Sequence, residues 1–191
     1  MSTILNGVIE IYDEYAESWF FVMDTFQIFN QDYDIFALLF DIRNYIEIKP
    51  IAPNRGLPND ISQQTKQKFK SKYDSDFTFI TYRELTTARD TEIKSKVISI
   101  ETDDQGGIVE EGFSTREKID FDSHELFGKV GTQEIWFRDG RYFVNREKTS
   151  KEIINSNWEF KLLMRIMNLL NEKHEMERIR WVVSLQLDRS R

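Results

Sequence analysis

Apolar and polar residues alternate near both ends of the chain, a pattern typical of strands in a half-buried sheet. Residues 8–11 and 18–24 are separated by the acidic stretch "DEYAE", and together they predict a β-hairpin. The C-terminal stretch "RIRWVVSLQLD", residues 178–188, predicts a long, half-buried, central strand that pairs with this hairpin. Its expected apolar face consists of Ile179, Trp181, Val183, Leu185 and Leu187.

The spacing of apolar residues becomes helical after the hairpin. Residues 35–42 place apolar side chains at steps of three and four. This run is also apolar enough for a buried strand. Asp32 or Asp34 at its start and Arg43 beyond its end favour a helix, because acidic residues stabilise the first turn and basic residues the end.

Capping residues predict two further helices. The polar stretch 60–73 contains Asp60 and Ser62 near its start, and either residue can cap a surface helix. Thr81 and Glu84 have the T-x-x-E spacing of a capping box. A short helix is therefore expected directly after the extended segment "DFTFI".

The longest helical pattern covers residues 150–176, with Ser150 as its expected cap. One apolar stripe repeats along it in four-residue steps and is expected to face the core. This stripe consists of Ile154, Trp158, Leu162, Ile166 and Leu170, widened by Leu163 and Met167.

These elements define the expected fold class. Asp139–Gly140 is a favoured hairpin turn between two apolar runs, whereas residues 93–130 carry few core signals and are expected to form an inserted flap. We expect a single α+β domain over residues 1–191. Its antiparallel or mixed sheet would contain the N-terminal hairpin, the Asp–Gly hairpin and the long C-terminal strand, with the long amphipathic helix on one face.

Composition narrows the classes of function. The 191 residues include no cysteine, which excludes disulfides, thiolate metal sites and cysteine nucleophiles. The chain has 33 acidic and 26 basic residues, a net charge of −7, which argues against general nucleic-acid binding. No apolar run is long enough for a membrane span and no signal peptide is recognisable, so a cytoplasmic location is expected.

All three prolines lie within nine positions of the segment "IKPIAPNRGLPND", residues 48–60. Proline fixes φ, so this loop is expected to be stiff and to present Arg55 as a bidentate donor for a phosphate or carboxylate. The same side chain could instead pair with Asp41, Asp60 or a carbonyl group and lock the loop, and both readings stay open. The candidate ligand- or partner-binding residues are Arg43, Asn54, Arg55, Gly56 and Asp60.

A weaker candidate for metal binding lies in "DFDSHE". Asp120, Asp122 and His124 alternate, so in a strand all three would share one face. Carboxylates with one imidazole suit a divalent cation, and an acidic solvated loop is the simpler interpretation. No metal or other cofactor is therefore assigned.

The run "YDIFALLFDIRNYIEIKPIAPNRGLPNDIS" resembles a family of small, mostly uncharacterised proteins of tailed bacteriophages and prophages. The family pattern is Y-D-x-F-x-x-L-F-x-x-R, a P-I…R-G-L-P-x-D-[VI]-S loop, an S-x-x-T-x-x-E-L segment and a C-terminal strand. These elements match residues 33–43, 50–62, 79–85 and 179–187. The resemblance implies a phage accessory protein in the host cytoplasm and brings no reaction with it.

The function expected from these observations is non-enzymatic binding of a host protein or an anionic small ligand, with host defence as a target. The alternatives are a metal-assisted hydrolase and a virion or assembly component, so an enzymatic role is not excluded. Neither membrane nor general nucleic-acid binding is expected. Formation of a homo-oligomer, by edge pairing of residues 178–188 or through Trp19 and Trp136, stays open.

Overall fold

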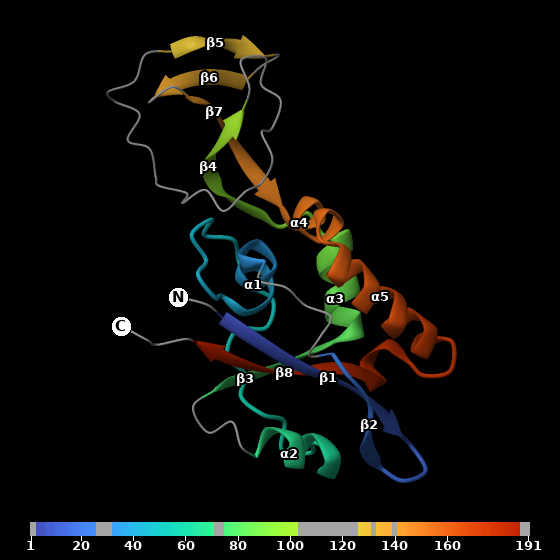
Figure 1. The fold of residues 1–191 in the computed structure, drawn as a ribbon. Coiled ribbons are helices and arrows are strands. Elements are labelled where there is room, and N and C mark those ends of the chain that lie inside the picture. The colour runs from blue at the N-terminus through green and yellow to red at the C-terminus, as the bar shows by residue number, and fades with distance from the viewer. Residues whose placement is uncertain are drawn as a thin grey trace.

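The computed structural model confirms the α+β class and contains two antiparallel sheets with five α-helices among the described residues (Figure 1). The described parts of the chain are residues 3–25, 32–70, 75–102, 126–130, 133–138 and 141–187. Helices α1, α3 and α5 lie on one side of the first sheet and α2 lies on the other (Figure 1).

The first sheet has the strand order β2-β1-β8-β3, and each neighbouring pair is antiparallel. It is built from β1 (Thr3–Asp13), β2 (Ser18–Asp24), β3 (Asp76–Thr81) and β8 (Ile179–Leu187). The N-terminal hairpin and its central C-terminal partner strand are thus confirmed. Because β8 has a strand on each side, edge pairing of this strand with another chain is ruled out.

Strand β8 is buried on both faces, so the expectation of a half-buried strand is wrong. Arg180 and Ser184 on its polar face are 3% and 0% exposed. Helix α2 (Gln63–Phe69), capped by Ser62, covers that face, and Phe69 packs in a small cluster with Val8 and Val182. The Arg180 guanidinium therefore needs partners inside the protein, whereas the buried Ser184 Oγ has no hydrogen-bond partner among the described residues.

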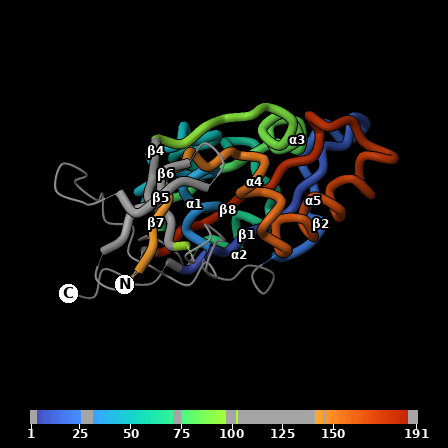
Figure 2. The backbone as a smooth tube through the Cα atoms, turned by 90° about the horizontal axis from the view of Figure 1, so that it is seen from above, coloured from blue at the N-terminus to red at the C-terminus, as the bar shows by residue number. Residues whose placement is uncertain are grey.

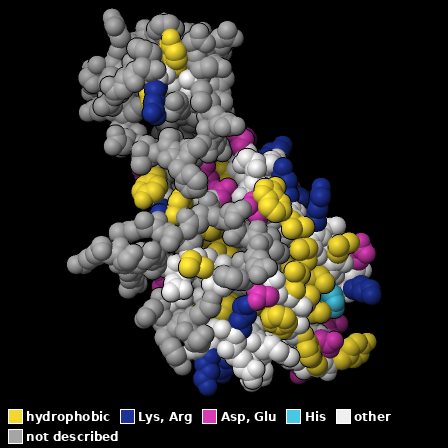
Figure 3. Space-filling model, in the orientation of Figure 1, with side chains coloured by type: hydrophobic (Ala, Val, Ile, Leu, Met, Phe, Trp, Pro, Cys, Tyr) yellow, Lys and Arg dark blue, Asp and Glu magenta, His cyan; other side chains and the backbone are white. Residues whose placement is uncertain are grey.

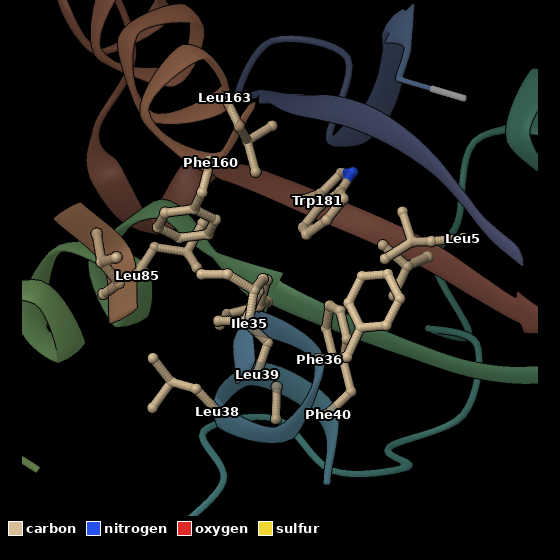
Figure 4. Close-up of a cluster of buried hydrophobic side chains, with 14 of the residues drawn as sticks. Leu5, Ile35, Phe36, Leu38, Leu39, Phe40, Leu85, Phe160, Leu163 and Trp181 are labelled. Carbon is tan, nitrogen blue, oxygen red and sulfur yellow. The ribbon is translucent and has the colours of Figure 1, made fainter. Parts of the chain in front are cut away.

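Helix α1 (Tyr33–Phe40) provides much of the larger core (Figure 4). The Asp32 carboxylate caps it by accepting hydrogen bonds from the amides of Asp34 and Ile35, at 3.0 and 3.1 Å. Every residue from 35 to 40 is buried. Of the two interpretations of this segment, the helix is confirmed and the buried strand is wrong.

Trp181 on β8 packs beside this helix, with its ring centroid 5.7 Å from that of Phe40. The indole Nε1 donates to Thr25 Oγ1 at 2.9 Å. On the neighbouring strand, a Cβ atom at Gly7 would lie 2.1 Å from the same indole nitrogen. Only glycine lets β1 approach Trp181 this closely.

The second sheet has the order β4-β7-β6-β5. Its strands are β4 (Lys94–Thr102), β5 (Leu126–Val130), β6 (Gln133–Arg138) and β7 (Arg141–Thr149). The expectation that the β6–β7 hairpin joins the main sheet is therefore wrong. It pairs instead with strands at the two ends of the 93–130 segment. The Asp139–Gly140 turn lies outside the described residues.

The capping box of α3 (Tyr82–Asp90) is present as predicted: Thr81 Oγ1 accepts from the Glu84 amide and Glu84 accepts from the Thr81 amide. Helices α3, α4 and α5 lie next to one another (Figure 2). None of the described helices is both long and apolar enough to cross a membrane.

The single long helix predicted over residues 150–176 is wrong. It is two helices, α4 (Ser150–Ser156) and α5 (Trp158–Asn171), and a short 3-10 turn follows. The cap of α4 is Thr149 rather than Ser150, and Asn157 starts the second helix by accepting from the Phe160 amide at 2.6 Å. This break shifts the buried stripe, so the core residues of α5 include Phe160, Leu163, Met164 and Met167.

Candidate binding loop

The connection between α1 and α2 has an unusual backbone. Left-handed φ angles occur at Asp41 (65°), Arg43 (47°), Glu47 (47°), Asn54 (39°) and Gly56 (77°). Asp41 is an ordinary left-handed helix C-cap, whereas the others lie within the loop itself. A side chain held in this region costs on the order of 1–3 kcal/mol, so surrounding contacts must hold the loop in place.

Hydrogen bonds fix the first half of the loop. The Asn44 amide group donates to Asp41 Oδ1 (2.8 Å) and to the Ile48 carbonyl (2.7 Å), and Asn44 Oδ1 accepts from the Ile48 amide (3.0 Å). The amides of Ile51 and Ala52 donate to carbonyls of α1 at 2.9 and 2.8 Å. The loop therefore rests directly on the end of the core helix.

Arg55 fastens the second half to α3. Its Nη2 donates to Glu84 Oε1 at 2.7 Å and to the Ile51 carbonyl at 2.9 Å, and its Nη1 donates to Glu84 Oε2 at 3.1 Å. Partial burial alone would raise the pKa of Glu84. The hydrogen bonds from Arg55 and from the Thr81 amide outweigh this effect and hold the pKa below its ordinary value.

The same segment covers the outer edge of β3. The Gly56 amide donates to the Phe77 carbonyl at 2.9 Å, and Arg55 Nη1 donates to the Phe79 carbonyl at 3.3 Å. Thr78, between these two residues, donates from Oγ1 to a loop carbonyl at 2.6 Å. A loop amide and a guanidinium thus satisfy edge carbonyls that would otherwise invite another strand.

Asp60 belongs to a second cluster. Its carboxylate accepts from Arg180 Nη1 at 2.7 Å and from Trp19 Nε1 at 2.8 Å. Arg180 also donates from Nε to Glu10 Oε2 at 2.9 Å, and Glu10 Oε1 accepts from the Ser62 amide at 3.1 Å. The Arg180 guanidinium lies 3.7 Å from the centre of the Trp19 ring. The exit of the loop is therefore tied to the central strand.

Burial is graded across this cluster. The side chains of Glu10 and Arg180 are 0% and 4% exposed, whereas that of Asp60 is 62% exposed. Partial burial would raise the pKa of Asp60. The hydrogen bonds and charge of Arg180, with the Trp19 hydrogen bond, outweigh it and hold the pKa below its ordinary value.

The five candidate residues do not converge on one ligand site. Arg43 stacks on the ring of Tyr33, 4.5 Å from its centre, and Asn54 is exposed. Arg55 pairs with Glu84 and not with Asp41 or Asp60, and the pairing with a carbonyl that the sequence also left open is confirmed at Ile51 and Phe79. Asp60 instead belongs to the Arg180 cluster.

Sequence reasoning missed Glu10 and Arg180 altogether, and it assigned Glu84 only its local capping role. The alternation along residues 178–188 placed Arg180 on the polar face, which was the one available signal. Its partners are 170 and 120 positions away in the chain, so no local pattern could pair them.

Metal chemistry gains no support from the described part of the chain, which holds no group of three or more His, Asp or Glu arranged for a cation. The weak candidates Asp120, Asp122 and His124 lie outside the described residues.

Trp136, a candidate for self-association, belongs to β6. Comparison of the chain with protein-family models, curated proteins and solved structures finds no match.

Proposed function

We propose that this chain is a phage accessory protein that acts without catalysis, by binding a host protein through the outer surface of loop 41–60. The concentration of left-handed backbone within this loop carries the proposal. Strained residues persist where the surrounding structure over-determines them, and they cluster at binding and switch regions. A loop mounted on a rigid scaffold is also where binding residues are most often found. The phage context rests on the sequence resemblance alone.

The loop divides into an inner and an outer part. Arg55 and Asp60 face inward partners and act as supports. Pro53, Asn54 and Leu57 are exposed, with Leu57 showing 37% of its surface. A prearranged apolar and amide surface loses little conformational entropy on binding, which favours a protein partner.

A small anion is the less favoured ligand. Both terminal nitrogens of Arg55 already donate to internal acceptors, and the Glu84 carboxylate balances the guanidinium charge. An incoming phosphate would have to displace this carboxylate from a bidentate contact. A host protein that contacts Asn54 and Leu57 needs no such rearrangement.

The test begins with capture of a host protein by the tagged full chain, followed by calorimetry with that protein in pure form. Leu57→Asp is expected to weaken its binding at least about tenfold, since it places a charge in the contact. Tyr15→Asp is the matched control, because Tyr15 is 100% exposed at the tip of the N-terminal hairpin. Equal binding by the wild type and both variants would show that the loop only braces the fold.

A further inference from the structure

The outward face of α5 carries large apolar side chains. Trp158, Leu162 and Leu169 are 62%, 37% and 63% exposed. At 100° per residue these three positions fall within an arc of about 40° on the helix surface. Hydrophobic side chains gather over this helix in the space-filling view (Figure 3).

The opposite face of α5 is already occupied by the core of the protein. Phe160, Leu163 and Met167 are each 0% exposed on that side. The helix is thus apolar on two opposite faces, and only one of them is covered. Large apolar side chains gathered on one exposed face of a helix mark an interaction surface, and here Arg165 lies at the edge of the stripe between Leu162 and Leu169.

The charges beside the stripe indicate which partner it suits. Lys161 and Arg165 are exposed along one flank, and Glu172 lies on the same flank just beyond the C-terminal end of the helix. The flank is therefore basic in its first half and acidic at its end. An identical helix running in the opposite direction would place Glu172 against Lys161.

We infer that the outward face of α5 binds a second copy of this chain, with the two α5 helices antiparallel about a twofold axis. In the register that sets Leu162 opposite Leu169 of the second copy, Lys161 lies within two positions of Glu172 of that copy. Twofold symmetry repeats each contact, so two leucine pairs and two ion pairs form, while Arg165 lies one position from Arg165 of the second copy at the axis. Trp158 at each end supplies the large aromatic contact typical of interface hot spots.

The alternative surfaces for self-association are less suitable. Strand β2 is the other edge of the main sheet, but a β-bulge interrupts its pairing with β1 between Ile9 and Glu10. Such bulges twist an edge away from strand addition. The β3 edge is covered by Arg55 and Gly56. The α5 contact does not depend on loop 41–60 and extends beyond the proposed function.

Sedimentation velocity of the full chain up to about 100 μM is the first measurement. We expect a species of twice the 22.9 kDa chain mass. Leu169→Glu is expected to raise the dimer dissociation constant at least about tenfold, since it buries a charge in the apolar stripe. Tyr15→Glu, far from the stripe in the sequence and fully exposed, should leave the constant unchanged.

Charge reversal distinguishes self-pairing from binding of a different protein. Lys161→Glu alone and Glu172→Lys alone should each weaken the dimer about two- to fivefold, and the double variant should regain the wild-type constant. Circular dichroism checks that each variant is folded. A monomeric wild type at the highest concentration, or a double variant as weak as the single ones, would overturn the inference. Binding of a host protein that depends on Trp158 without any dimer would do the same.

Discussion

Two arginines perform the same chemistry in very different surroundings. Arg55 and Arg180 each bind a carboxylate through two guanidinium nitrogens. Both guanidinium groups also lie near the ring of Phe79, with their central carbon atoms 5.6 and 6.0 Å from the ring centre. The Arg180 side chain is 4% exposed and that of Arg55 is 29% exposed. The comparison shows how the contribution of an ion pair to stability differs between the buried central strand β8 and the partly exposed edge of β3.

Arg180 is buried because β8 is central. Its charge cannot reach bulk water, so Glu10, Asp60 and Trp19 replace the water around it. A buried pair of this kind adds little net stability compared with apolar residues, but it becomes costly when one partner is removed. Its effect is to fix the register between the hairpin, the central strand and the loop.

Arg55 acts instead at the boundary with solvent. It donates to two backbone carbonyls, those of Ile51 and Phe79, as well as to Glu84. If it were removed, water could reach these acceptors, because the surrounding side chains are partly exposed. The two arginines should therefore differ in their contribution to stability, although their hydrogen bonds have similar lengths.

The largest expected effect is that of Arg180→Ala. It should lower the free energy of unfolding by about 3–5 kcal/mol, because the buried Glu10 side chain would lose its cationic partner. Urea denaturation followed by tryptophan fluorescence measures this change.

The double variant Glu10→Gln with Arg180→Ala is the control for the unpaired charge. It should be more stable than Arg180→Ala alone, since glutamine can still accept from the Ser62 amide and carries no charge. Two changes that simply add would contradict the idea that an unpaired buried carboxylate is responsible.

Arg55→Ala should have a smaller effect, about 1–2 kcal/mol. It removes a partly exposed ion pair and two hydrogen bonds to carbonyls that water can then reach. Lys96→Ala, which removes a more exposed ion pair with Glu47, is the matched control and should change stability by less than about 0.5 kcal/mol. If Arg55→Ala is no worse than this control, the guanidinium does not brace the loop.

The sequence was sufficient where the relevant signals are local. The capping box of Thr81 and Glu84 spans four residues, and it predicted the start of α3 correctly. The alternation over residues 178–188 predicted β8, and the helical spacing over 35–42 predicted α1. In each case the pattern depends on backbone geometry that neighbouring residues determine.

The sequence was insufficient where distant residues decide. Burial of both faces of β8 depends on where α2 packs. The pairing of β7 with β4 depends on which strands, distant in the sequence, assemble into the second sheet. Asn157 is a favoured cap residue and was the one signal for the break between α4 and α5. For the candidate loop, the three clustered prolines were the local signal, but the partners of Arg55 and Asp60 come from other strands and helices.

Asp60→Asn should have an effect of about 0.5–1 kcal/mol. The side chain is mostly exposed, so the ion pair with Arg180 is screened by water, and asparagine can still accept one hydrogen bond. Glu10 remains as the partner of Arg180 in this variant. Urea denaturation would place Asp60→Asn far nearer to the wild type than Arg180→Ala, and a loss as large as that of Arg180→Ala would show that both carboxylates are equally essential.

The smallest expected effect is the pH dependence of the Arg55–Glu84 contact. The pKa of Glu84 is lowered in the folded protein, so below its unfolded value of about 4 the unfolded state binds more protons. The stabilisation is therefore complete above that value and is lost as the pH falls through the lower folded pKa. Glu84→Gln lacks this titration but keeps the capping acceptor, so its stability should approach that of the wild type between pH 5 and about pH 3. Urea midpoints of both proteins across this range measure the difference, and a gap that stays constant would mean that the charge of Glu84 contributes nothing to the brace.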